Sequence, residues 1–529
     1  MNGFAPSKHP LIREQNMSLL DEKSLSDIDS DPERCGYDTG SSRAQKWMNS
    51  AGRIPAGFRI SRFWSAGLRV GFFILPSFVQ SRLSGEPKQQ SKKPGPTAYL
   101  DGMRGLAAFF VFFCHYFYTC FVIAEGWGYG EHNYSFLKLP IVRLFYQGPP
   151  MVCVFFVISG YALSLRPLKL ARARALDALA SSMASLVFRR AVRLFVPTAL
   201  STLLVVVLLR LGAYEGTRGL ARDPVFMRNV HEHHPERRAS AAAQLAEWAH
   251  YMFDFVHVWD WRKFGGSTPL DVHLWTIPVE FRASMMLFLT LMGTARLRTC
   301  MRFVVLAGVT WFSYRSDRWE MVLFYAGMGL AELDLIRGAH TPSLSGALVP
   351  TLPTTSPDSS LTRRTAHAGS LVWPLLSVVA LYLMSQPDAY GEQTPGWVYL
   401  SSLIPVWFSD KYRYWQSVGA ILLVLAVGRS PGWQRVFTNA PALYLGRISY
   451  AVYLMHGPVL HTLGYAVERW AWGITGMEGG WYNMGFVLAA LINVPAVIWA
   501  ADLWWRAVDA PVVRFAKWLE ASCSVPDGK

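Results

Sequence analysis

The chain has 529 residues, of which 52% are hydrophobic, and its 51 basic and 36 acidic residues give a formal net charge of +15. Its apolar residues gather in segments of about 18 to 24 residues, the length needed to cross a bilayer core. The basic residues lie mainly between these segments, as the positive-inside rule requires, so the charge indicates membrane topology and not a nucleic-acid partner. Composition therefore predicts an integral, multi-pass protein of an endomembrane or the plasma membrane, in contact with lipids.

The N-terminal residues 1–96 are polar, rich in Ser, Asp, Lys and Arg, and are expected to be cytosolic. One apolar stretch within them, at residues 62–80, is interrupted by Arg69. Because a charged group in the middle of a span is costly, we expect this stretch to form an interfacial helix. The first membrane crossing is therefore expected after residue 96.

Ten apolar segments follow, and each is predicted to form a transmembrane helix. They lie at residues 98–121, 147–165, 194–211, 274–294, 301–313, 320–336, 371–386, 414–428, 442–465 and 483–504. The segment between the second and third spans holds seven Lys and Arg residues against one acid, Asp177, so we expect it to face the cytosol. With ten spans, both termini then lie in the cytosol.

The predicted fold class is all-α, with one membrane domain at residues 97–517 and a C-terminal tail at residues 518–529. Residues 338–370 are rich in Ser, Thr and Pro, a composition typical of disordered segments, and are predicted to form a cytosolic linker. The six cysteines are scattered, so their spacing predicts neither disulfides nor a metal site.

The first span carries ionisable residues on one face. Arg104 and His115 are eleven residues apart, which at about 100° per residue brings them within about 20° of the same direction. Asp101 lies about 40° from that line. His115 is roughly 16 Å beyond Arg104, near the middle of a core about 30 Å thick, where an ionisable group faces a protein interior or a wet cavity. His115 is thus either a packing residue satisfied by a neighbouring helix or a functional group.

The segment "YLDGMRGLAAFFVFFCHYF" resembles the first span of the acyltransferase-3 family of integral membrane O-acyltransferases, in which a basic residue, ten intervening residues and a histidine form a signature. Five further blocks resemble the family in the same order, and they make the chain similar to its fungal-type members. These blocks contain Phe155, Phe156, Ser159, Gly160 and Tyr161; Arg190 and Arg193; Trp275 and Glu280; "LGRISYAVYLMHGPV"; and "WWRAVDAPVVRF".

The resemblance implies an enzyme that moves an acyl group, expected to be acetyl, from acyl-CoA to a hydroxyl of a carbohydrate, lipid or secondary metabolite. His115 suits the role of general base, because a neutral imidazole has a pKa close to the working pH. Arg104, Arg190 and Arg193 suit the phosphates of the donor, which guanidinium groups bind bidentately. We expect no permanently bound cofactor.

Glu280 is a second candidate catalytic residue in this resemblance. It lies near the start of its span, where a carboxylate could orient His115 or balance an arginine. A structural ion pair with Arg282 or with another helix is the alternative. Thr276 and Pro278 depart from the family pattern around this glutamate.

Ser449, Tyr453 and His456 fall at positions i, i+4 and i+7, and hence on one helix face. They could line the path of the acceptor, although a polar seam between helices would show the same pattern. His231 and His234 belong to the loop sequence "HEHHPE", for which we expect no metal site.

A proton-coupled transporter is the alternative function, with Asp101, Arg104, His115 and Glu280 as its relay. We prefer the enzyme, because the chain lacks paired Gly- or Pro-broken spans in two related halves. A phosphorylated donor also accounts better for the cytosolic arginines.

Overall fold

The computed structural model describes residues 70–83, 95–131, 133–260, 266–339 and 359–525. Within these ranges the chain forms α-helices joined by loops and by short 3-10 and π-helical turns, with no β-strand. The predicted all-α class is therefore confirmed for the described residues.

Each predicted span overlaps a helix. These helices are α5 (Ala98–Phe117), α6 (Gly148–Arg172), α7 (Leu176–Arg210), α10 (Thr276–Thr294), α11 (Thr299–Arg315), α12 (Trp319–Ile336), α13 (Ser359–Met384), α15 (Arg413–Val427), α17 (Ala440–Val459) and α19 (Gly480–Trp504). The other helices are α4 (Ser77–Leu83), α8 (Glu215–Arg218), α9 (Ala241–Val256), α14 (Val398–Ser402), α16 (Pro431–Phe437), α18 (Tyr465–Thr475) and α20 (Ala510–Cys523).

Short helical turns connect several of these helices. The 3-10 turns are η2 (Phe136–Lys138), η3 (Val142–Tyr146), η4 (Leu220–Arg222), η5 (Val272–Trp275) and η6 (Gly391–Gln393). Two turns are π-helical, η7 (Leu460–Gly464) and η8 (Trp505–Asp509). Because η8 joins α19 to α20 without a break, residues Gly480–Cys523 form one helix of 44 residues.

Four helices in the described chain are long and apolar enough to cross a membrane. They are Gly148–Arg172, Leu176–Arg210, Val272–Thr294 and Gly480–Cys523. Several other predicted spans are shorter: α11 has 17 residues and α15 has 15. The number of ten crossings and the position of the termini stay predictions.

The predicted linker at residues 338–370 is shorter than expected, because α13 already begins at Ser359. Residues 340–358 lie outside the described part. The physical reason is the distribution of proline: Pro357 is followed by a run without proline up to Pro374, and a helix can form once the prolines end.

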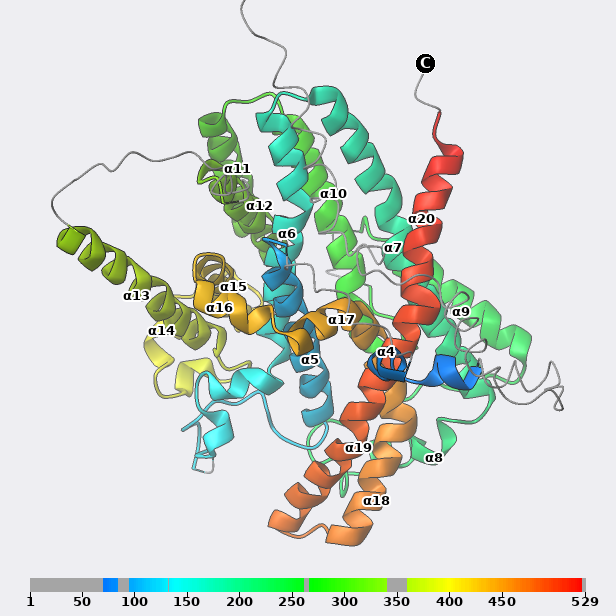
Figure 1. Cartoon of the computed structure of the whole chain (residues 1–529). Coiled ribbons are helices and arrows are strands. Elements are labelled where there is room, and N and C mark those ends of the chain that lie inside the picture. Colours follow the sequence, from blue (N-terminus) through cyan, green and yellow to red (C-terminus); the bar gives the residue numbers. More distant parts are fainter. Residues whose placement is uncertain (1–69, 84–94, 132, 261–265, 340–358, 526–529) are drawn as a thin grey trace, which may run out of the picture.

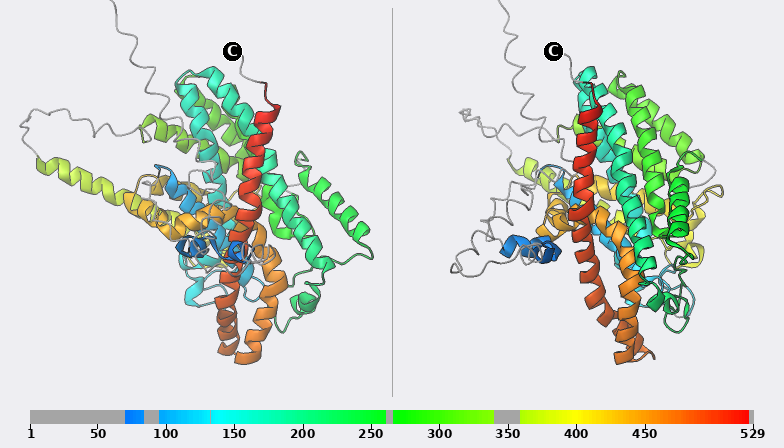
Figure 2. Two further views of the ribbon diagram at one scale, coloured as in Figure 1. Left: turned by 45° about the vertical axis from the view of Figure 1, so that its right-hand side comes forward. Right: turned by 90° about the vertical axis from the view of Figure 1, so that its right-hand side faces the viewer.

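Different helices form the two ends of the molecule (Figure 1). The turn between α6 and α7 and the end of α20 lie near one end, while α18 and α19 form a hairpin at the other. Figure 2 shows the same division from two further directions. The helices α5 and α17 lie between these ends.

Glycines allow two helix pairs to pack closely. A Cβ atom at Gly105 of α5 would lie 2.2 Å from the backbone nitrogen of Gly446 of α17. A Cβ atom at Gly160 of α6 would lie 2.2 Å from the carbonyl oxygen of Phe324 of α12. Such small-residue contacts let helix backbones approach where apolar burial alone does not drive association. The first contact holds α5, with Arg104 and His115, beside α17, with Ser449, Tyr453 and His456.

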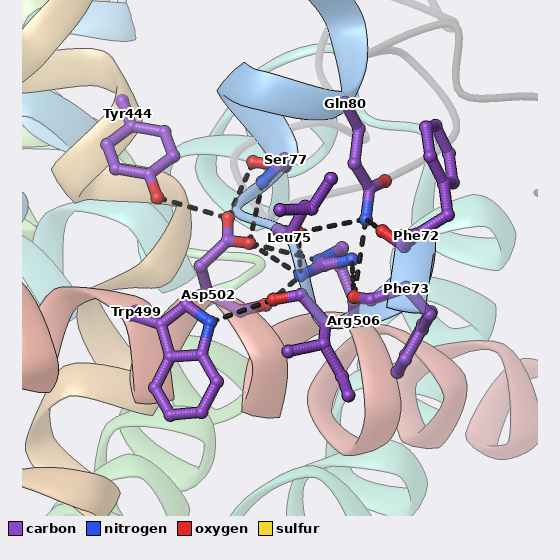
Figure 3. A network of polar contacts seen from close by, with 10 residues as sticks. Phe72, Phe73, Leu75, Ser77, Gln80, Tyr444, Trp499, Asp502 and Arg506 are labelled. Carbon is purple, nitrogen blue, oxygen red and sulfur yellow. Dashed lines mark hydrogen bonds and ion pairs between the residues drawn. The ribbon is translucent and has the colours of Figure 1, made fainter. Parts of the chain in front are cut away.

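The segment at residues 70–83, which ends with α4, is held against α19 by polar contacts (Figure 3). The buried carboxylate of Asp502 accepts hydrogen bonds from the backbone N–H of Ser77 at 2.9 Å and from its hydroxyl at 2.5 Å. It also accepts one from the hydroxyl of Tyr444 at 3.1 Å, and it forms an ion pair with Arg506 at 3.0 Å.

Arg506 in turn donates hydrogen bonds to the carbonyl oxygens of Phe73 and Leu75, at 2.7 and 2.9 Å (Figure 3). Several apolar side chains of the same segment are exposed, among them Val70 at 58% and Phe78 at 48%. A segment with one polar, fastened side and one exposed apolar side fits the predicted interfacial helix. Its predicted first residues, 62–69, lie outside the described part.

Candidate active site

A cavity of about 120 Å³ lies among α5, α6, α7, α10, α17 and η8. Its lining includes most of the predicted site residues: Arg104, Arg190, Arg193, Glu280, Ser449 and Tyr453. Apolar side chains complete the wall, among them Val111, Val152, Phe155 and Phe156. The structure therefore brings the predicted donor-binding arginines together with Glu280 and two of the three predicted acceptor residues.

The cavity wall is rich in charge. Glu280 forms an ion pair with Arg190 at 2.7 Å and accepts a hydrogen bond from the Ser159 hydroxyl at 3.3 Å. Asp509, at the end of η8, attracts Arg193 and Arg104 electrostatically. Arg104 also forms an ion pair with Asp101 at 3.8 Å, so each of the three guanidinium groups has a carboxylate nearby, with which an anionic ligand would compete.

The face of α5 matches the predicted periodicity. Arg104 and Val111 line the cavity, and His115 follows Val111 by about one helical turn. α5 ends at Phe117, four residues before the predicted end of the span, so His115 lies in its last turn. Beyond that end, Asn229 from a distant loop donates hydrogen bonds to the carbonyl oxygens of residues 118 and 121 at 2.6 and 3.1 Å, which satisfies acceptors that a longer helix would use.

His115 and His456 do not line the cavity but meet a third histidine, His273 of η5. The ring centroids of His115 and His273 are 3.9 Å apart, and those of His115 and His456 are 5.1 Å apart. His273 and His456 are 5.2 Å apart. Sequence reasoning missed His273, although it stands two residues before the Trp275 of a family-like block.

In two of these rings, Nδ1 has a polar partner that holds the ring in place. Nδ1 of His273 lies 3.0 Å from Oδ1 of Asp271, which also accepts the backbone N–H of His273 at 3.0 Å. Nδ1 of His456 lies 3.1 Å from the carbonyl oxygen of Val452. Asp271 fits against α17 because residue 457 is glycine: a Cβ atom there would lie 2.7 Å from Oδ2 of Asp271.

Tyr453 connects the cavity to the histidines. Its hydroxyl donates a hydrogen bond to the carbonyl oxygen of His273 and accepts one from Thr276 at 2.6 Å. Its ring centroid is 6.0 Å from that of His456. The cavity with the arginines and the cluster of histidines are therefore neighbouring parts of one site.

Glu232 brings a second carboxylate to the histidines from the "HEHHPE" loop. Its oxygens lie 3.4 Å from Nε2 of His273 and 2.5 Å from Nε2 of His461, and it accepts a hydrogen bond from Tyr465. Burial alone would raise the pKa of Glu232, but the attraction of His461 and the hydrogen bonds from both histidines outweigh it and hold this pKa well below its usual value.

The histidines of the same loop have different surroundings. His231 and His233 are exposed, while His234 is buried against His461 and Tyr465, with ring centroids 4.9 and 5.9 Å away. Burial, together with the nearby His461, lowers the pKa of His234 to about 3. The loop therefore contributes its acid, Glu232, to the cluster and not its run of histidines.

Glu280 and Ser449 make contacts that narrow their predicted roles. Glu280 pairs with Arg190 of α7, so a structural ion pair with another helix, one form of the predicted alternative, is compatible with its contacts. Arg282 pairs with Glu320 at 3.7 Å. Of the two functional roles predicted for Glu280, orienting His115 or balancing the charge of an arginine, its contacts favour the second. The Ser449 hydroxyl donates to the carbonyl oxygen of Gly446 at 2.9 Å.

Comparisons with known proteins give one family. Residues 97–505 match the acyltransferase 3 family, described as an acyltransferase domain. The chain is 34% identical over 459 residues to O-acetyltransferase PaAT-1 of Phomopsis amygdali, an alignment that covers 84% of this chain and 87% of the relative. No solved structure matches significantly.

Two further relatives are more distant. Acyltransferase R4 of a Phoma species is 27% identical, with 83% of this chain and 98% of the relative covered. Acyltransferase clz18 of Cochliobolus lunatus is 26% identical, with 81% and 97% covered. These matches favour the predicted enzyme over the transporter and confirm the resemblance to fungal members. The chain belongs to the acyltransferase 3 family and is an acyltransferase that transfers groups other than amino-acyl groups.

Proposed function

We propose that this chain is a multi-pass membrane O-acyltransferase that moves an acetyl group from cytosolic acetyl-CoA to a hydroxyl of a carbohydrate, lipid or secondary metabolite. The observation that carries the proposal is the cavity in which Arg104, Arg190 and Arg193 meet beside the histidines. A relative that is 34% identical and is called an O-acetyltransferase supports acetyl as the transferred group.

The donor binds through its phosphates. Guanidinium groups form paired hydrogen bonds to phosphate oxygens, and three of them line the cavity. Glu280 keeps Arg190 in position until a phosphate competes for it. The charge pattern predicts that Arg190 and Arg193 face the cytosol, the side on which acyl-CoA is present.

The acceptor hydroxyl reacts at the histidine end of the site. His115 takes the hydroxyl proton while the oxygen attacks the thioester carbonyl, forming the new ester C–O bond. The C–S bond then breaks, and the leaving CoA thiolate takes up a proton, so no net proton or electron is consumed. Ser449, Tyr453 and His456 line the acceptor path, with Tyr453 at the junction of the two parts.

The test uses purified protein in lipid nanodiscs with labelled acetyl-CoA and an extract of candidate acceptors. The wild type should release free CoA thiol and form a labelled ester. His115→Gln keeps a polar side chain but cannot accept the proton, so transfer should fall roughly 10²- to 10⁴-fold while acetyl-CoA still binds.

His250→Gln is the matched control, because His250 is exposed on α9, with 68% of its side chain accessible. It should keep normal transfer. Near-normal turnover by folded His115→Gln protein would contradict the base assignment, and a labelled amide in place of an ester would contradict the acceptor class.

A further inference from the structure

Two buried ring nitrogens in the histidine cluster have no hydrogen-bond partner within the described chain, Nδ1 of His115 and Nε2 of His456. Nε2 of His273 faces a single partner, the carboxylate of Glu232 at 3.4 Å. One ring nitrogen from each of these histidines lies within 4.8 Å of the others. Because a buried nitrogen without a partner is costly, such convergence points to a ligand that is shared by all three.

The opposite sides of two rings are already engaged. Asp271 holds Nδ1 of His273, and the carbonyl oxygen of Val452 holds Nδ1 of His456. In metal sites, a carboxylate or carbonyl group on the far nitrogen sets the tautomer of the histidine and aims its free lone pair at the ion. These contacts leave Nε2 of His456 available as a ligand, and Nε2 of His273 would ligate an ion in place of its contact with Glu232.

The surroundings favour a cation. Two carboxylates flank the His273 ring: Asp271 lies at Nδ1, and Oε1 of Glu232 lies 3.4 Å from Nε2. Oε1 of Glu232 has no other polar partner among the described residues. In a tetrahedral site with metal–nitrogen distances of about 2.0–2.1 Å, neighbouring ligand atoms are about 3.4 Å apart. The three ring nitrogens lie within 4.8 Å of one another, so small movements of the rings would bring them to this separation.

We propose that His115, His273 and His456 bind a divalent transition metal ion of the zinc class. A set of imidazole nitrogens suits Zn²⁺, Cu²⁺ or Ni²⁺ and not the oxygen-seeking Mg²⁺ or Ca²⁺. The three ligands leave a tetrahedral ion one open position.

The site has a consequence for catalysis that rests on the proposed function. A neutral imidazole has a single nitrogen lone pair, so His115 cannot ligate a metal and accept a proton at the same time. Bound metal therefore inhibits acyl transfer, and its removal releases the base.

The binding test uses full-length protein purified through an affinity tag without histidine, stripped with a chelator and equilibrated with Zn²⁺. Mass spectrometry of the metal should find about one ion per chain, the occupancy of a single built site. The double variant His273→Gln and His456→Gln should lose this ion, and His250→Gln should retain it. Equal metal content in the double variant and the wild type would overturn the site.

A readout on the wild type removes any dependence on the folding of variants. Co²⁺ in a four-coordinate nitrogen site absorbs visible light strongly, whereas hydrated Co²⁺ does so weakly. Wild-type protein titrated with Co²⁺ should develop these bands and lose them when Zn²⁺ is added. Absence of the bands at saturating Co²⁺ would also overturn the site.

Activity then separates the two proposals. Metal-free protein should transfer acetyl groups, and Zn²⁺ should reduce the rate in proportion to occupancy. No bound metal together with an active enzyme would overturn the metal site and leave the proposed function standing. Bound metal that is required for transfer would uphold the site and overturn both the inhibition and the role of His115 as base.

Discussion

The guanidinium group of Arg190 lies 2.7 Å from the carboxylate of Glu280, and this ion pair joins α7 to α10 across the cavity. The pair is partly buried, with 13% and 25% of the two side chains exposed. Glu280 thus lies beside an arginine, on the side of the site for which we propose donor binding, while the histidines lie at the other side. An anionic donor would meet an arginine that is already oriented.

Neutralising Arg190 and Arg193 together should weaken donor binding more than it slows turnover. Because these groups are proposed to contact the phosphates and not the reacting carbonyl, we expect KM for acetyl-CoA to rise at least about 10-fold with a smaller change in kcat. Steady-state kinetics in nanodiscs measure both constants.

Arg189→Ala is the control for this variant. Arg189 adjoins Arg190 in sequence but pairs with Glu520 at 3.2 Å and is not among the residues that line the cavity. Its KM should match that of the wild type. An unchanged KM in the double variant would mean that Arg190 and Arg193 serve only membrane topology.

Adding a methyl group at Gly457 should disturb the histidines without touching them. The new Cβ atom would lie 2.7 Å from Oδ2 of Asp271, so the carboxylate that orients His273 must move. We expect Gly457→Ala to lower kcat about 10-fold, within the range that loss of an orienting partner causes. Gly473→Ala in α18 places a Cβ atom with nothing within 4 Å and should keep normal kcat. Equal rates for the two variants would contradict the orienting role of Asp271.

Stability should fall with acidification because of His234 and Glu232. The pKa of His234 is about 3 in the folded chain against 6.5 as its ordinary value, so the unfolded chain binds this proton first. The stabilisation is complete above pH 6.5 and is lost as the pH falls toward 3. Glu232, whose pKa is also lowered, adds a loss that begins near 4.5.

Thermal unfolding of detergent-solubilised protein between pH 7 and 5 measures the contribution of His234 apart from that of Glu232. His234→Gln cannot be protonated, so its melting temperature should fall less steeply over this range than that of the wild type. Parallel slopes for the two proteins would show that His234 is not the group that titrates.

Chemical labelling of cysteines tests the predicted membrane topology. Cys300 and Cys523 are exposed and, in the ten-span arrangement, face the cytosol. A membrane-impermeant maleimide added to intact cells should label an introduced cysteine at Ser135, which lies in the predicted external loop, but neither native residue. Permeabilisation should then expose Cys300 and Cys523. Labelling of Cys523 in intact cells would reverse the orientation.

Part of the cavity wall could be predicted from the sequence. Helical periodicity puts Arg104 and His115 on one face of α5, but only Arg104 lines the cavity. Arg190 and Arg193 follow from the family-like block, and both line the cavity. Helical periodicity does not determine which acid contacts a given arginine. The contact between Glu280 and Arg190 therefore could be found only from the structure.

The histidine side could not be predicted in the same way. His273 and Asp271 belong to a short turn, and Glu232 to a loop about 40 residues earlier, so no periodic pattern links them. Long-range packing of loops against α17 brings them together. The end of α5 at Phe117 also involves a distant loop, from which Asn229 donates hydrogen bonds beyond the last turn.

The two π-helical turns have an evolutionary consequence. A π turn contains one more residue than an α turn, and one commonly arises when a single residue is inserted into a helix. Without the extra residue at η8, the helix face beyond it would rotate by about 100°, and Asp509 would no longer line the cavity. Relatives whose alignment shows a one-residue gap within Trp505–Asp509 should therefore have no acid in the place of Asp509 beside the arginines. A gap within Leu460–Gly464 should mark relatives in which His461 no longer contacts Glu232. Homologues can thus be sorted by ancestral insertions that ordinary substitution scores would overlook.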